Sequence, residues 1–150
     1  MSTAAALNIP VQIQRYFDTL DDREFEQTAA LFAPDGQLVP PFEKPIQGRE
    51  AIAQYLTAEA SEMTFTPAES ELLAPDVDEG EPHCIQTWIV KGKVKTSLFT
   101  VNVAWQFELS MTALETHENN SSIQTSIQTS IQTVEIKLIA SLNELLKFKR

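Results

Sequence analysis

The sequence predicts an α+β domain in which short helices come first and a sheet follows. Apolar and polar residues alternate from Phe99 to Leu109, the period of two that is typical of a half-buried strand. Between residues 11 and 32 the apolar residues recur instead at the three- and four-residue spacing of a helix face. Helices that precede the strands, without alternating with them, favour an α+β arrangement over βαβ units.

The composition limits the classes of protein that this chain can belong to. At 150 residues it has the length of one domain, so we expect a single domain over 1–150. The net charge of −10 disfavours nucleic acid as a partner, because phosphates would be repelled.

No apolar run reaches the roughly 18 residues of a spanning helix, and residues 1–7 lack a basic signal-peptide start. The sequence therefore predicts a cytoplasmic protein. Its single cysteine, Cys84, excludes an intrachain disulfide and disfavours a structural zinc site.

The first predicted helix follows a loose start over residues 1–10 and runs from Val11 to Leu20. Its apolar face consists of Ile13, Phe17 and Leu20. Tyr16 lies at the turn spacing from Ile13 and Leu20, so its side chain can also face inward.

A second helix is predicted after Asp21 or Asp22, either of which can cap its first turn. Pro34-Asp35-Gly36 is expected to end this helix. Its apolar stripe consists of Phe25, Ala29 and Phe32. A short extended piece from Gln37 to Val39 then stops at Pro40-Pro41, since prolines lack the N–H donors that a central strand needs.

The segment through Phe42 and Pro45 is predicted to be a loop or a sheet edge, and a third helix follows Gly48. This helix carries Ile52, Tyr55 and Leu56 inward. The strands expected after it are Met63 to Phe65, Glu69 to Leu73, His83 to Lys95, the stretch around Trp105, and Val134 to Ile139. Ser141 and Glu144 fit a capping box, which predicts a short C-terminal helix.

Trp105 sits midway along the apolar face of its predicted strand. Its ring would be covered there, while its indole N–H still needs a hydrogen-bond acceptor. A polar partner is therefore expected opposite Trp105. A backbone carbonyl in an ordinary core would also satisfy the indole.

Residues 118–133 are predicted to be a low-complexity hairpin insertion. From Ser122 to Thr133 the chain repeats Ser-Ile-Gln-Thr three times, and its β-branched residues favour a strand. The isoleucines of the repeat stand at odd-numbered positions, as do Glu135 and Lys137, so in one regular strand they would all face the same side. Unless a bulge intervenes, they are expected to face away from the core.

Several short motifs together resemble one known family. They are Tyr16-Phe17, Ala30-Leu31-Phe32, Leu38 with Pro40-Pro41-Phe42, Lys44-Pro45-Ile46, Gly92-Lys93-Val94, Asn102 with Ala104-Trp105, and Ala140-Ser141 with Glu144-Leu145-Leu146. The chain resembles the nuclear transport factor 2-like fold, and within it the orange carotenoid protein C-terminal domain family of cyanobacteria, especially its free-standing homologues. The resemblance implies a cone in which N-terminal helices and a short C-terminal helix pack on a curved, mostly antiparallel sheet and enclose a pocket.

The resemblance also implies a ligand. In that family a tyrosine and a tryptophan, at the positions of Tyr16 and Trp105, hydrogen-bond the keto oxygen of a ketocarotenoid such as canthaxanthin or echinenone. A carbonyl accepts two donors, and both side chains offer a donor on an apolar body. The predicted carotenoid-binding residues are Tyr16, Leu98, Val103, Trp105, Phe107, Ile136 and Leu138. Core packing is the alternative role for each of the wall residues.

The partners expected from the resemblance follow from the length of a carotenoid. One small domain cannot cover it, so we expect a homodimer that shares one carotenoid, with Cys84 either bridging the two subunits or remaining a buried thiol. The implied function is carotenoid storage, photoprotective quenching of singlet oxygen, and delivery to apo helical carotenoid proteins. Pigment uptake would involve transient contact with a membrane.

The fold also hosts enzymes, so a ketosteroid-isomerase-like enzyme is the alternative. By alignment the general base of such an enzyme falls at Val39 or Pro40, and its second acid falls at Val103. None of these three can transfer a proton, which favours a protein that is not an enzyme. The nearest spare carboxylates are Asp18, Glu43 and Glu59, where solvated faces are the simpler interpretation. A protein-interaction module is the third interpretation.

Overall fold

A computed structural model describes residues 9–73, 83–117 and 123–139, and it confirms the α+β class. Its elements are α1 (Val11–Asp21), α2 (Phe25–Ala30), β1 (Phe32–Val39), β2 (Ile46–Gln47), α3 (Arg49–Glu59), β3 (Thr64–Leu72), β4 (His83–Lys95), β5 (Thr100–His117) and β6 (Ile123–Ile139). The strands form one sheet in the order β2-β1-β6-β5-β4-β3. All neighbouring pairs are antiparallel except β1 and β6, which run parallel.

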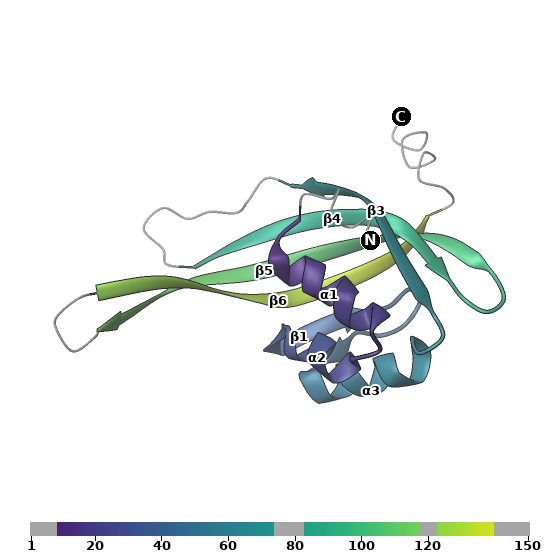
Figure 1. Cartoon of the computed structure of the whole chain (residues 1–150), viewed down its shortest axis with the longest axis horizontal. Helices are drawn as coiled ribbons and strands as arrows, with labels where there is room; N and C mark the ends of the chain where they lie inside the picture. The colour runs from purple at the N-terminus through teal and green to yellow at the C-terminus, as the bar shows by residue number, and fades with distance from the viewer. Residues whose placement is uncertain (1–8, 74–82, 118–122, 140–150) are drawn as a thin grey trace.

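The long strands β4, β5 and β6 curve side by side across the molecule, and α1 lies against them (Figure 1). On the other flank α3 packs on α2 and β1. The core fills the space between the helices and one face of the sheet. Its largest fully buried side chains are Trp105, Tyr16, Phe32, Phe107, Ile13, Leu20, Leu38, Ile52, Leu109 and Ile131. No helix in the described part of the chain is long and apolar enough to span a bilayer.

The first helix forms as predicted, and it buries Tyr16 together with Phe17. The second helix is shorter than predicted: it ends at Ala30, and neither Asp21 nor Asp22 caps it. The chain enters β1 at Phe32, since the Ile131 N–H donates to the Leu31 carbonyl, 2.9 Å away, and draws this segment onto β6.

The Pro-Asp-Gly sequence at 34–36 therefore lies inside β1 and does not end a helix. The pairing of β1 with β6 shifts register between Phe32 and Gln37, which accommodates the proline. A Cβ at Gly36 would lie 3.0 Å from the Ile131 carbonyl oxygen, a tight contact, so the close approach of β1 and β6 here favours a glycine.

The third helix confirms the predicted start after Gly48, and Ile52 and Leu56 are buried as expected. The two short strands predicted before residue 74 are one continuous strand, β3, with a bulge between Pro67 and Glu69. Gly92 of β4 lies opposite this bulge, where an added Cβ would collide with the Thr66 carbonyl.

The repeat segment differs from the expectation in one respect. Ile131 and Val134 are both fully buried, although an odd-numbered and an even-numbered position of one regular strand would face opposite sides of the sheet. Glu108 pairs with Thr133 and Leu109 with Ile131, so Gln132 is a bulge that turns Ile131 into the core. The exception named for the isoleucines, an intervening bulge, therefore applies to Ile131, which faces the core. The side chains of Ile123 and Ile127, the C-terminal helix predicted after Ser141, and residues 1–8 of the loose start lie outside the described part.

Candidate ligand-binding site

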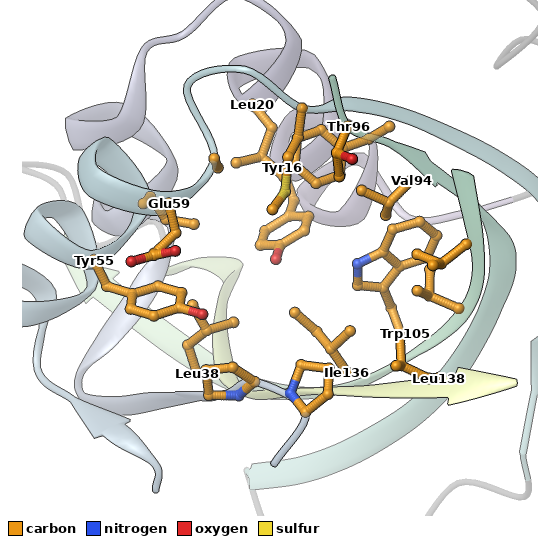
Figure 2. Close-up of a pocket in the computed structure, with 18 of the residues that line it drawn as sticks. Tyr16, Leu20, Leu38, Tyr55, Glu59, Val94, Thr96, Trp105, Ile136 and Leu138 are labelled. Atoms are coloured by element: carbon orange, nitrogen blue, oxygen red, sulfur yellow. The ribbon is translucent and has the colours of Figure 1, made fainter. Parts of the chain in front are cut away.

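A cavity of about 230 Å³ opens between the concave face of the sheet, α1 and α3 (Figure 2). Its wall is almost entirely apolar. It is lined by Tyr16, Leu20, Leu38, Pro40, Pro41, Tyr55, Leu56, Glu59, Ala60, Met63, Phe65, Val94, Thr96, Phe99, Val101, Val103, Trp105, Ile136 and Leu138. A concave apolar site with a few polar groups is the usual form of a small-molecule pocket.

Two aromatic side chains enter this cavity from elements far apart in the sequence. Tyr16 comes from the middle of α1, and Trp105 comes from the middle of β5, between Val90 of β4 and Ile136 of β6. Each is only 1% exposed. The alternation of β5 puts Trp105 on the same face as Val103 and Phe107, as predicted.

Edge-to-face ring contacts fix both side chains in place. The Phe17 ring lies 4.8 Å from Trp105 and 5.2 Å from Tyr16, measured between ring centroids. The Phe107 ring, which does not line the cavity, lies 5.1 Å from Tyr16. Such contacts stabilise aromatic pairs beyond simple burial, so the two donors are preorganised before any ligand arrives.

The polar atoms of the pair face into the cavity. Figure 2 shows the Tyr16 hydroxyl pointing to its centre and the Trp105 indole nitrogen turned toward the same space. Neither atom is hydrogen-bonded to another described residue, and neither is a sealed, unsatisfied buried group, so both remain open to the cavity. The polar group expected opposite the Trp105 indole is thus the Tyr16 hydroxyl, which faces the same cavity. Two convergent donors in an apolar pocket fit a ligand that presents one strong acceptor, such as a carbonyl oxygen.

Burial keeps Tyr16 a donor. Desolvation, and secondarily the nearby Tyr55, raises the pKa of Tyr16 above its usual range. Burial, followed by the charges of Glu43 and Glu59 and a hydrogen bond to Glu43, raises the pKa of Tyr55 to about 12. The half-buried Tyr55 hydroxyl donates to Glu43 Oε2 at 3.4 Å. At neutral pH the Tyr16 hydroxyl keeps its proton.

The raised pKa of Tyr16 predicts a loss of stability in alkali. Below pH 10 the phenol is protonated in both the folded and the unfolded chain. Above it the unfolded chain ionises first, so the free energy of unfolding falls by up to about 1.4 kcal/mol per pH unit for this buried group. Urea unfolding at about pH 8 and about pH 11 should show that wild type loses stability relative to Tyr16→Phe as the pH rises between the two values. A difference that does not change with pH would contradict the raised pKa.

The predicted site residues fall into three groups. Val103, Ile136 and Leu138 line the cavity with Tyr16 and Trp105. Phe107 is fully buried in contact with Tyr16 and does not line the cavity. Leu98 lies in the turn between β4 and β5, 85% exposed, and is not part of the wall.

The remaining wall residues were not identified from the sequence as site residues. Leu38 and Pro40-Pro41 line the cavity and belong to one of the motifs on which the family resemblance rests, so that motif could have identified them as site residues. Tyr55, Phe65 and Val94 reach the cavity only through the packing of α3 and β3 on β4. Cys84 belongs to β4, where it pairs with Met111, and its disulfide remains a prediction.

The described wall offers little for acid–base chemistry. Glu59 is its single carboxylate, and this exposed side chain lies near the end of α3, at the side of the cavity where Tyr55 enters (Figure 2). Asp18 and Glu43 do not line the cavity. Pro40 and Val103 do line the cavity, and they occupy two of the positions where an isomerase would carry its acidic residues. The geometry therefore favours binding over proton transfer.

Comparisons with known proteins show which proteins this chain is similar to. A family model described as a SnoaL-like domain matches residues 13–116. The orange carotenoid-binding protein of Synechocystis sp. is 30% identical over 142 residues, which is 92% of this chain and 38% of that protein. The solved orange carotenoid protein of Anabaena (Nostoc) sp. PCC 7120 binding canthaxanthin is 28% identical, with a TM-score of 0.67 over 91% of this chain and 38% of that one.

Two more distant structures show the fold alone. A ketosteroid isomerase-like protein from Erwinia carotovora atroseptica is 13% identical, with a TM-score of 0.59 over 94% of this chain and 100% of its own. Nuclear transport factor 2 from Cryptosporidium parvum is 15% identical, with a TM-score of 0.57 over 85% and 88%. The expected nuclear transport factor 2-like fold is confirmed. This chain spans under two-fifths of the length of the carotenoid-binding relative and of the carotenoid protein structure.

Proposed function

Since the chain belongs to the SnoaL-like domain family, we propose that it binds a ketocarotenoid through Tyr16 and Trp105. The observation that carries the proposal is the pair of buried, unpaired donors that converge in an apolar cavity. A ketocarotenoid ring matches this site, because its methyl-rich body suits the wall and its keto oxygen accepts both donors. The related Anabaena protein binds canthaxanthin, a pigment of this chemistry.

The cavity accommodates one end of such a pigment. Ligand pockets that enclose a drug-sized molecule hold about 300–1,000 Å³, whereas this cavity holds about 230 Å³. The rest of a long polyene would pass the rim beside Phe99 and Leu138, which are 57% and 45% exposed. Phe42 and Leu98, 92% and 85% exposed, add apolar surface near the rim segments. A second copy placed mouth to mouth would cover this surface and the other half of the pigment.

An open mouth also suits a carrier. A pigment held at one end by two hydrogen bonds can leave for another apolar site, so the protein would store carotenoid and deliver it to apo helical carotenoid proteins, as well as quench singlet oxygen. Uptake would need transient contact between the apolar rim and a membrane, with the protein otherwise in the cytoplasm. The protein would act in all these steps as a binding protein and not as an enzyme.

The test is an absorbance spectrum of the protein purified from cells that make canthaxanthin or echinenone, followed through size exclusion in the visible and at 280 nm. We expect a coloured peak at twice the chain mass or more, red-shifted from free pigment. Tyr16→Phe and Trp105→Phe each remove one donor and should weaken pigment retention about two- to tenfold while shifting the spectrum.

Tyr55→Phe is the matched control. Its hydroxyl lies in the same wall but is directed at Glu43, so its removal should leave the spectrum unchanged. A folded but colourless wild type would contradict the proposal. So would a coloured one that keeps its spectrum in the Tyr16 and Trp105 variants.

A further inference from the structure

Strand β6 extends well beyond its neighbour β1. On one side it pairs with β5 along its whole length, from Asn102 with Ile139 to His117 with Ile123. On the other side β1 begins to pair only at Ile131. The β5–β6 hairpin projects past the helices at one end of the molecule (Figure 1). Within the part of the chain that the structure describes, residues 123–129 of β6 therefore have a strand on one side only.

The backbone groups at this open side can be assigned. The Ile131 N–H donates to Leu31 and the Thr129 carbonyl accepts from Gln12 Nε2 at 2.7 Å, so both residues point away from β5. In an antiparallel ladder successive residues point alternately to either side. Because the pairing is regular from Ile131 to Ile123, residues 123, 125 and 127 direct their N–H and C=O groups to the open edge.

The other edges of the sheet carry features that discourage pairing with a further strand. Edge strand β3 contains Pro67, Glu69 and Glu71 and a bulge, and edge strand β2 is two residues long. Prolines, charges, bulges and short strands are the usual protections of an exposed edge. The open part of β6 lacks them: its pairing with β5 is regular from Ile131 to Ile123, and residues 119–133 contain no charged residue, proline or glycine.

We propose that residues 123–127 of β6 pair antiparallel with the same residues of a second copy of this chain. The two sheets would then join across a two-fold axis. The tetrapeptide repeat makes the edge complementary to itself, because Thr125 faces Thr125 of the second copy while Ile123 faces Ile127. Each copy carries a charge of −10, and residues 123–127 place no charge of their own at the contact.

This contact is independent of the proposed pigment site. Leu138 at the cavity rim and Thr125 lie 13 residues apart on one strand, which is about 40 Å. The test accordingly uses the apo protein, made in cells without carotenoid. Its result does not depend on whether the protein binds carotenoid. Cys84→Ser in the same chain removes any disulfide contribution.

Sedimentation velocity of this apo protein should show a concentration-dependent species at twice the chain mass of 16.8 kDa. Thr125→Pro removes an edge N–H and no bond to β5. By symmetry the dimer loses two hydrogen bonds, which should raise its dissociation constant about five- to 150-fold. Thr125→Val keeps the N–H and the β-branched shape, and should dimerise like wild type.

Hydrogen exchange of the 125 and 127 amides provides the second readout. In the wild type we expect protection of both amides that rises with protein concentration. In Thr125→Pro, which has no amide at 125, the protection of 127 should be lost while the circular dichroism stays that of the wild type. A monomer at all concentrations would overturn the proposal, as would amides protected equally in dilute protein or a dimer that Thr125→Pro leaves intact.

Discussion

Val103→Phe should give a protein that is more stable than wild type and no longer takes up carotenoid. Val103 is 1% exposed and lines the cavity beside Trp105. The larger ring would project into empty space, and filling such space commonly raises the free energy of unfolding by about 1 kcal/mol. The same ring would occupy the place of the pigment ring, so pigment retention should fall below detection.

Gln106→Phe is the control for this experiment. It introduces the same side chain three positions further along β5, on the face of the sheet away from Trp105. Pigment uptake should survive it. Urea unfolding and the visible spectrum measure the two halves of the prediction, and a Val103→Phe protein that binds pigment normally would show that the cavity is not the carotenoid site.

The two donors of the site could be predicted because each depends on local periodicity. Alternation alone puts Trp105 on the buried face of β5, and helical spacing turns Tyr16 inward from α1. Their convergence is a property of the fold, and it came from the resemblance to a known family. Wall residues such as Tyr55 and Val94 have no local signal, since α3 and β4 bring them to the cavity through contacts between distant segments.

The errors in the predicted fold also have a non-local origin. Phe32 fits the apolar stripe of a helix, but the hydrogen bond from Ile131 to the Leu31 carbonyl pulls its segment into β1. Ile131 has the wrong parity for the core until the bulge at Gln132 changes it. A bulge adds one residue to a strand without any necessary change in composition, so counting along the chain cannot reveal it.

Phe107→Ala should lower the free energy of unfolding by about 3–5 kcal/mol, a larger loss than that expected from removing the hydroxyl of Tyr16 or of Tyr55. The Phe107 side chain is fully buried, and its ring meets Tyr16 and Phe17 at centroid distances of 5.1 and 5.8 Å. Truncation would lose these contacts and leave a cavity behind Tyr16. Since small domains are stable by only about 5–15 kcal/mol, this is a large fraction of the total. Urea unfolding at neutral pH measures it.

Phe42→Ala provides the comparison, because that ring is 92% exposed and its loss should change the free energy of unfolding by no more than about 0.5 kcal/mol. If both alanine variants have the same stability, Phe107 does not support the core as described.

The Phe107→Ala variant should also affect the proposed pigment site. Tyr16 would lose the ring that backs it and gain rotational freedom, so the folded fraction of Phe107→Ala should hold pigment less tightly than wild type although Phe107 does not line the cavity.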